Sequence, residues 1–151
     1  MAASLADLLK AEHVTLALPV STRDEALRAI VATMEIGEPE KFLAEVIARE
    51  EVHTTFMGNG VAFPHARTDL VTTLSLGIGR SVEGVPFGEK GELAHLIFVI
   101  GVPKKMINKD LVCVGALARV TKVEETRAAL VETDSAAEFV EMLRAGSLLL
   151  E

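Results

Sequence analysis

A chain of 151 residues is long enough to bury a hydrophobic core of its own, and we predict a single domain over residues 1–151. The formal net charge of −7 excludes a nucleic-acid-binding protein, because such proteins need a concentrated basic surface. The longest unbroken apolar run, Leu96 to Ile100, is far shorter than the about 20 residues that cross a bilayer. One cysteine, Cys113, and no signal-peptide pattern favour a cytoplasmic protein without direct membrane insertion.

The first part of the chain predicts a short helix, a strand and a longer helix. Leu5 to Leu9 has helical spacing, and Val14 to Leu18 reads as a strand that ends at Pro19. Ser21 is the expected N-cap of the longer helix, because a serine hydroxyl accepts a hydrogen bond from the first turn. This helix ends at Gly37. Its apolar stripe comprises Leu27, Ile30, Val31 and Met34.

A second helix is predicted to begin at Pro39, a residue favoured in the first turn because its missing N–H is not needed there. Its buried stripe comprises Phe42, Leu43, Val46 and Ile47. Arg49 lies near the C-terminal end, where a cation interacts favourably with the helix dipole. Glu50 and Glu51 follow, and adjacent helical positions point apart, which disfavours a paired-carboxylate mechanism.

The middle of the chain predicts two strands. Residues 73–78 alternate between polar or small and apolar side chains, which is the period of a half-buried strand. Residues 81–92 are rich in turn formers. They lead into the run LAHLIFVIGV, residues 93–102, which is typical of a central strand covered on both faces and is stopped by Pro103.

Three helical segments are predicted in the C-terminal part, over residues 111–118, 123–131 and 135–146. The last has a capping box of Ser135 with Glu138 and a terminal Gly146. Because strands are interleaved with helices along the chain, we expect an α/β domain with helices on both faces of a sheet.

Residues 49–69, REEVHTTFMGNGVAFPHARTD, combine features of an anion site. A lone loop histidine such as His65 is more often a hydrogen-bonded surface group than a reactive one. Pro64, however, stiffens the segment that presents the imidazole, and glycines let backbone N–H groups approach a phosphate closely. Hydroxyls and guanidiniums add donors for a dianion. The candidate phosphate-binding residues are Thr54, Thr55, Gly58, Asn59, Gly60 and Arg67, with Arg49 as a second cation.

This combination is typical of a histidine that accepts a phosphoryl group. Positioning and charge stabilisation carry most of the catalysis in such a transfer, and a neutral imidazole nitrogen already has its lone pair. The other ring nitrogen must be held as N–H by a neighbouring acceptor. We therefore predict that His65 is catalytic and that the reaction needs no cofactor.

The same residues carry a resemblance to a known family. Arg49-Glu50, Gly58-Asn59-Gly60 and Val61-Ala62-Phe63-Pro64-His65 resemble, in order and spacing, the active-site segment of IIA phosphocarrier domains. These domains belong to the bacterial phosphoenolpyruvate-dependent sugar phosphotransferase system, fructose/mannitol type, including its nitrogen-regulatory branch. The resemblance continues through residues 83–103 and the C-terminal helices. It implies a mixed five-stranded sheet flanked by helices, phosphorylation of His65, a phosphoryl contact from Arg49, and a histidine phosphocarrier protein as donor.

The resemblance breaks at Asp110, which stands where the family has a second active-site histidine. A carboxylate near unmodified His65 would hold a ring N–H, but after transfer it would repel the phosphoryl dianion. Two functions remain open. The chain is either a phosphotransferase that passes phosphate to a sugar-specific transporter domain, or a regulatory binding module that controls a transporter or kinase.

The remaining histidines have weaker patterns. His53 is a possible accessory donor at the site, although a partly exposed loop residue is the plainer interpretation. His95 lies inside the apolar strand and reads as structural, and His13 looks incidental. A zinc site that combines histidines with Cys113 or Asp110 is a remote third reading, because no pair has the short spacing of metal ligands, and we predict no metal.

Overall fold

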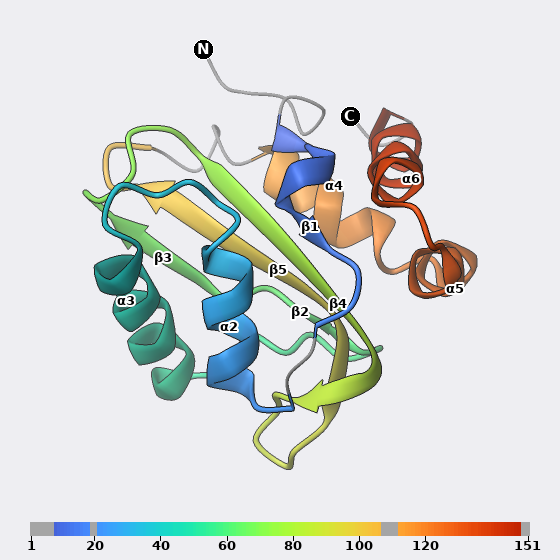
Figure 1. Ribbon diagram of the computed structural model, residues 1–151, viewed down its shortest axis with the longest axis horizontal. Coiled ribbons are helices and arrows are strands. Elements are labelled where there is room, and N and C mark those ends of the chain that lie inside the picture. The colour runs from blue at the N-terminus through green and yellow to red at the C-terminus, as the bar shows by residue number, and fades with distance from the viewer. Residues whose placement is uncertain (1–7, 19–20, 107–111, 149–151) are drawn as a thin grey trace.

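The computed structural model describes residues 8–18, 21–106 and 112–148 (Figure 1). Within these ranges a five-stranded sheet lies between two layers of helices. The elements in chain order are η1 (Ala11–His13), β1 (Val14–Thr15), α2 (Arg23–Val31), α3 (Pro39–Val52), β2 (Val61–Ala62), β3 (His65–Thr68), β4 (Ser75–Pro86), β5 (Leu93–Pro103), α4 (Val112–Val120), α5 (Glu124–Glu132) and α6 (Ala136–Leu148). In the described part of the chain, no helix has both the length and the hydropathy that a membrane span requires.

The sheet is mixed, and β5 is its central strand. The strand order is β1-β4-β5-β2, and β3 also pairs with β5. Strand β4 is antiparallel to β5, whereas β2 and β3 are parallel to it, with Val61 opposite Leu96 and His65 opposite Ile100. Strands β2 and β3 therefore lie one after the other along the same edge of β5, separated by Phe63 and Pro64. The predicted mixed five-stranded sheet is confirmed.

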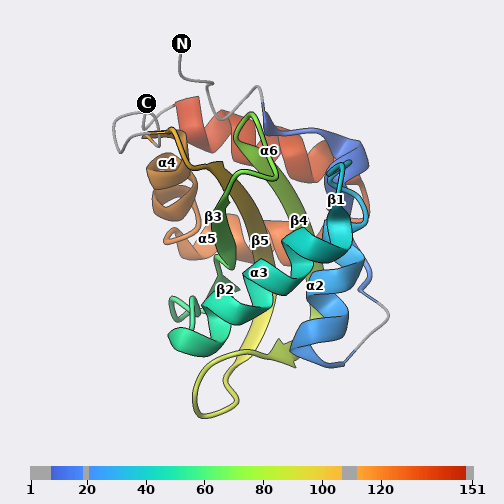
Figure 2. The ribbon, with the colours of Figure 1, turned by 90° about the vertical axis from the view of Figure 1, so that its left-hand side faces the viewer.

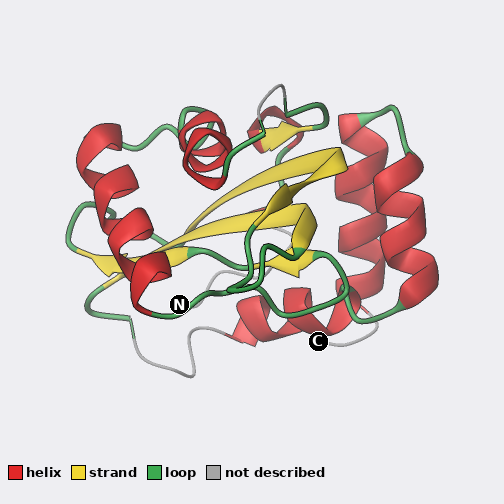
Figure 3. Cartoon of the chain, turned by 90° about the horizontal axis from the view of Figure 1, so that it is seen from below, coloured by secondary structure: helices red, strands yellow, loops and turns green. Residues whose placement is uncertain are grey.

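Each face of the sheet carries its own hydrophobic core. Helices α2 and α3 cover one face, which is turned to the viewer in Figure 2, and α4, α5 and α6 lie behind the sheet in that view. Seen from below, the strands lie between the two helical layers (Figure 3). Successive residues of β5 alternate between the cores: Phe98 packs with the α4–α6 layer and Ile97 with the α2–α3 layer. The interpretation of residues 93–102 as a strand covered on both faces is confirmed.

Several boundaries in the N-terminal part differ from those predicted. Strand β1 covers only Val14–Thr15, and most of the predicted helix over residues 5–9, like Pro19, lies outside the described residues. The N-cap of α2 is Thr22 rather than Ser21, since the backbone N–H of Glu25 donates to Thr22 Oγ1 at 3.3 Å. Helix α2 ends at Val31, well before Gly37, and turns follow as far as Glu35, whose φ is 60°.

Residues 73–75 alternate as predicted for a half-buried strand, with Leu74 buried and Thr73 exposed, but from Leu76 to Ser81 both faces of β4 are covered. The reason is Gly77, whose hydrogen lets Met34 approach the sheet. A Cβ at this position would lie 2.5 Å from Met34 Cγ and 2.9 Å from Ile30 Cγ2. The strand also continues to Pro86 through the segment predicted as turns, with a register shift between Arg80 and Val85.

The three C-terminal helices form near their predicted positions. Ser135 Oγ accepts the backbone N–H of Glu138 at 3.1 Å, as the capping pattern predicted. Gly146 does not end α6, which continues to Leu148. Instead, a Cβ on Gly146 would lie 3.1 Å from Val120 Cγ1, so the glycine lets α6 pack closely against the end of α4.

Candidate functional site

His65 is the first residue of β3 and is held on the sheet by its neighbours. The carbonyl oxygen of Pro64 accepts the N–H of Ile100 at 3.0 Å, which ties the preceding residue to β5. In β3, Ala66 and Thr68 are buried, His65 is half-buried and Arg67 is exposed. Because strand side chains alternate between faces, His65 and Arg67 lie on the same face of the sheet.

The His65 ring has one nitrogen committed to a hydrogen bond. Nδ1 lies 3.0 Å from the carbonyl oxygen of Phe63. A carbonyl oxygen can only accept, so Nδ1 carries the proton in the neutral ring and Nε2 keeps its lone pair. The acceptor that the sequence analysis required is therefore the backbone two residues earlier.

Phe63 is itself fixed by two contacts. Its ring stacks on Phe98, with centroids 5.2 Å apart and an interplanar angle of 18°. Its N–H donates to the carbonyl oxygen of Thr55 at 3.2 Å. The oxygen that holds His65 Nδ1 thus belongs to a well-anchored residue.

The glycine segment before β2 is a tight turn with left-handed backbone. Gly58, Asn59 and Gly60 have φ values of 86°, 56° and 75°, a conformation that glycine adopts without steric cost. The turn closes through Met57 N–H to the Val61 carbonyl oxygen at 2.8 Å. The carbonyl oxygen of Gly60 accepts from the N–H groups of both His95 and Leu96, at 2.7 and 3.0 Å, so the turn is fastened to β5.

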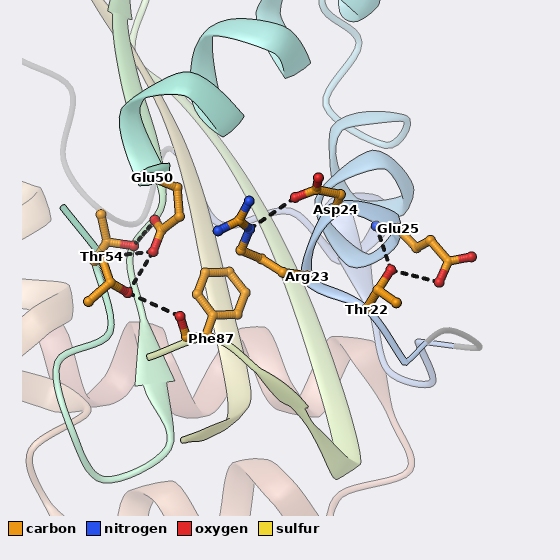
Figure 4. Close-up of polar contacts among 8 residues, drawn as sticks. Thr22, Arg23, Asp24, Glu25, Glu50, Thr54 and Phe87 are labelled. Carbon is orange, nitrogen blue, oxygen red and sulfur yellow. Dashed lines mark hydrogen bonds and ion pairs between the residues drawn. The ribbon is translucent and has the colours of Figure 1, made fainter. Parts of the chain in front are cut away.

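Thr54 and Thr55 lie around the carboxylate of Glu50, which is 3 % exposed at the end of α3. Figure 4 shows the hydroxyl of Thr54 directed at Glu50 and, more weakly, at the carbonyl of Phe87. Thr55 donates to Glu50 both from its N–H, at 2.8 Å, and from its hydroxyl, at 2.6 Å. The two hydroxyls predicted to bind phosphate are therefore engaged within the protein.

The burial of Glu50 was missed by the sequence analysis, although a signal for it exists. Glu50 follows Val46 by four positions and continues the apolar stripe of α3, so helical spacing directs it inward. The neighbouring Glu51 is exposed. A charged residue at a stripe position, followed by two threonines, is a pattern that predicts a buried, hydrogen-bonded carboxylate.

The two predicted cations occupy different places. Arg49 Nη1 donates to the carbonyl oxygen of His53 at 2.7 Å and so binds the C-terminal end of its own helix. Arg67 Nη1 lies 3.5 Å from the carbonyl oxygen of Lys104, whose ammonium is 3.6 Å from Asp69. Among the described residues, no hydrogen bond or ion pair joins either arginine to His65. Arg67 lies on the same face of the sheet as His65. Arg49 belongs to α3, which covers the opposite face.

The other histidines lie apart from this arrangement. His53 is exposed and its Nδ1 is 3.0 Å from the carbonyl oxygen of Thr54. His95 is half-buried in β5, and its Nδ1 is 2.9 Å from the carbonyl oxygen of Ser81. His13 Nε2 lies 4.0 Å from a carboxylate oxygen of Glu35. Residues 8–18, 21–106 and 112–148 contain no group of three or more potential ligands placed to hold a metal ion. Asp110 lies outside the described residues.

Fold and site together define a mixed α/β domain that presents a half-buried histidine, His65, on the strand β3 at the edge of its sheet. The chain belongs to the family described as "Phosphoenolpyruvate-dependent sugar phosphotransferase system, EIIA 2", whose model matches residues 7–146. The predicted relationship to IIA domains of the fructose/mannitol type is therefore confirmed. Members of this family are phosphotransfer proteins.

Individual relatives support the same assignment. The chain is 30% identical over 129 residues to the "PTS system fructose-specific EIIA component" of Haloferax volcanii, and the match covers 82% of this chain and 84% of the relative. A second match, to the "PTS system fructose-specific EIIABC component" of Bacillus subtilis, is 29% identical and covers 74% of this chain. The match spans 18% of the length of that larger protein.

Solved structures share the fold. The nitrogen regulatory protein IIA-Ntr from Neisseria meningitidis superimposes with a TM-score of 0.83 at 24% identity, covering 92% of this chain and 98% of that chain. Enzyme IIA mannitol from Escherichia coli, in its complex with phosphorylated enzyme IIB mannitol, superimposes with a TM-score of 0.77 at 25% identity. That match covers 91% of this chain and 97% of the IIA chain. The predicted mannitol-type IIA fold is confirmed.

Proposed function

We propose that this chain is a phosphoryl carrier whose acceptor atom is Nε2 of His65. The observation that carries the proposal is the 3.0 Å contact between His65 Nδ1 and the Phe63 carbonyl oxygen. This contact puts the proton on Nδ1 and leaves the Nε2 lone pair as the nucleophile. No general base is then needed for attack.

The transfer balances without a further reactant. The Nε2 lone pair forms a bond to phosphorus while the bond from phosphorus to the donor's histidine nitrogen breaks, and that bond's electron pair returns to the donor ring. The His65 ring is then cationic and keeps its Nδ1 proton, so its hydrogen bond to the Phe63 carbonyl is strengthened by charge. The onward step is the reverse process, with the acceptor's nucleophile attacking the same phosphorus.

In this proposal, charge stabilisation of the phosphoryl group is assigned to the arginines. Arg67 shares the face of His65 and is exposed, so it can turn toward a dianion bound there at the cost of only its 3.5 Å contact with the Lys104 carbonyl. The left-handed turn at Gly58 and Gly60 lies farther along this edge of β5, beside His95 and Leu96, whereas His65 pairs with Ile100, so its backbone N–H groups are not assigned to the phosphoryl group. Arg49 reaches the phosphoryl group in this proposal only by releasing the His53 carbonyl.

The proposed donor is a histidine phosphocarrier protein, and the proposed acceptor is a sugar-specific IIB-type domain. The structure of the Escherichia coli relative in complex with phosphorylated enzyme IIB supports the second partner. The test is incubation with labelled phosphoenolpyruvate and the general phosphotransferase proteins. We expect label on the chain and none on His65→Ala. Unchanged labelling of His65→Ala would overturn the assignment.

A regulatory role is the second candidate, and the residue that favours it is Asp110 in place of the family's second histidine. The same assay separates the two roles. Label that a sugar-specific partner domain removes supports a carrier, whereas stable label that no such domain removes supports a switch. We expect Asp110→Asn to label faster, because the change removes the repulsion between the carboxylate and the phosphoryl group. Equal rates would show that Asp110 does not face the site.

A further inference from the structure

Glu50 is a buried carboxylate at the end of α3, and its hydrogen-bond partners in the described part of the chain are uncharged. Oε2 accepts from the Thr54 hydroxyl at 2.7 Å and from the Thr55 N–H at 2.8 Å, and Oε1 accepts from the Thr55 hydroxyl at 2.6 Å. Three short bonds to a charged acceptor offset the cost of removing it from water. Such a group holds its donors firmly, because each bond lost leaves part of a buried charge unsatisfied.

Two more hydrogen bonds connect this cluster to the acceptor histidine. The carbonyl oxygen of Thr55 accepts the N–H of Phe63 at 3.2 Å, and the carbonyl oxygen of Phe63 is 3.0 Å from His65 Nδ1. An antiparallel bridge between Phe56 and Ala62 runs beside the first of these bonds. A continuous series therefore leads from Glu50 through Thr55 and Phe63 to the imidazole.

We propose that Glu50 is a positioning residue for His65. By holding Thr55 through both its N–H and its hydroxyl, the carboxylate fixes the Thr55 carbonyl, which orients the Phe63 peptide. The Phe63 carbonyl in turn selects the Nδ1–H tautomer and the ring orientation that exposes Nε2. The consequence for phosphoryl transfer rests on the proposed function, but the effect on the tautomer does not.

Glutamine tests the carboxylate with little change of shape. Glu50→Gln replaces one accepting oxygen by an NH2 group, which cannot accept from the threonines. The matched control is Glu51→Gln, which makes the same change at the exposed neighbouring position. The first readout is nuclear magnetic resonance of the unphosphorylated protein with ¹⁵N-labelled histidine, which distinguishes Nδ1–H from Nε2–H.

We expect neutral His65 to be Nδ1–H in the wild type and in Glu51→Gln, and a mixture of tautomers in Glu50→Gln. At saturating donor, we expect the labelling rate of Glu50→Gln to fall on the order of 10- to 100-fold, as for other losses of positioning. The donor concentration for half-maximal rate should stay the same, because the donor's docking surface is unchanged. An Nδ1–H tautomer and an unchanged rate in folded Glu50→Gln would overturn the proposal.

A second pair of variants covers the case in which Glu50→Gln does not fold. Thr55→Val removes the hydroxyl that donates to Oε1 and keeps the N–H, whereas Thr55→Ser keeps both donors. We expect Thr55→Val to shift the tautomer and slow labelling, and Thr55→Ser to restore both. If Thr55→Val keeps the wild-type tautomer of His65 and the wild-type labelling rate, the proposed connection from Glu50 to His65 is refuted. If the wild type takes no label but Glu50→Gln still alters the tautomer, the positioning role stands and the phosphoryl-carrier proposal fails.

Discussion

The ring of Phe63 stacks on the ring of Phe98, with centroids 5.2 Å apart. Phe98 is fully buried at the centre of β5, and Phe63 is the residue whose carbonyl holds His65 Nδ1. The stack therefore joins the core of the sheet to the candidate acceptor. The position of the proposed acceptor nitrogen at the sheet edge depends on packing in the interior.

Phe98→Leu should lower the free energy of unfolding by about 1–3 kcal/mol, because it removes buried volume and the aromatic contact together. Urea denaturation measures this change. Phe139→Leu is the matched control, since Phe139 is also fully buried but has no stacked ring among the residues described. Equal losses in the two variants would show that the stack adds nothing beyond burial.

Arg80, which is 6 % exposed, connects β4 to the segment after β1 and to the C-terminal end of α5. Its guanidinium donates to the carbonyl oxygen of Leu16 at 2.9 Å, to that of Leu130 at 3.1 Å, and to that of Thr133. Arg80→Met keeps the apolar stem but leaves these carbonyls without their donor. We expect a loss of about 2–4 kcal/mol in thermal or urea unfolding.

The control for this variant is Arg28→Met, which breaks the ion pair of Arg28 with Glu40 at the protein surface. Exposed pairs contribute little, so we expect a change below about 1 kcal/mol. A similar small change in Arg80→Met would mean that water replaces the guanidinium at the three carbonyls.

Gly77→Ala should destabilise the protein by about 1–3 kcal/mol, because the new methyl group would overlap Met34 and Ile30, which pack on this face of the sheet. Gly37→Ala introduces the same methyl group where no atom lies within 4 Å. We expect that variant to be neutral or slightly more stable. The midpoints of denaturant unfolding of the two variants are compared. Equal midpoints would show that close packing at Gly77 does not require a glycine.

Arg67→Ala should slow phosphoryl transfer to His65 without weakening the fold. The side chain is exposed, so the free energy of unfolding should change by less than about 0.5 kcal/mol. Loss of a cation on the face of the acceptor should reduce the initial labelling rate by roughly 10-fold or more. Arg23→Ala, on α2 and paired with Asp24, is the control and should label normally. A normal rate for Arg67→Ala would remove Arg67 from the proposed site.

The sequence by itself determined the layered fold and the candidate acceptor. The apolar run of β5 and the apolar stripes of α2 and α3 are local patterns. The run indicates a strand buried on both faces, and each stripe indicates which face of its helix is buried. The glycine turn and Pro64-His65 are local too, because they depend on the backbone freedom of a few adjacent residues. This is why the sheet, the helical layers and the resemblance to IIA domains could be predicted.

Only the tertiary structure decided how the side chains around His65 are used. The coverage of β4 on both faces depends on Met34, which is far from it in the sequence. Glu50 engages Thr54 and Thr55, and the His53 carbonyl engages Arg49, across only four or five residues, but residue types alone did not show that these donors bind within the protein instead of a phosphate. Residue types limit which hydrogen bonds are possible, but the choice among competing donors and acceptors depends on distances that the packed chain alone sets.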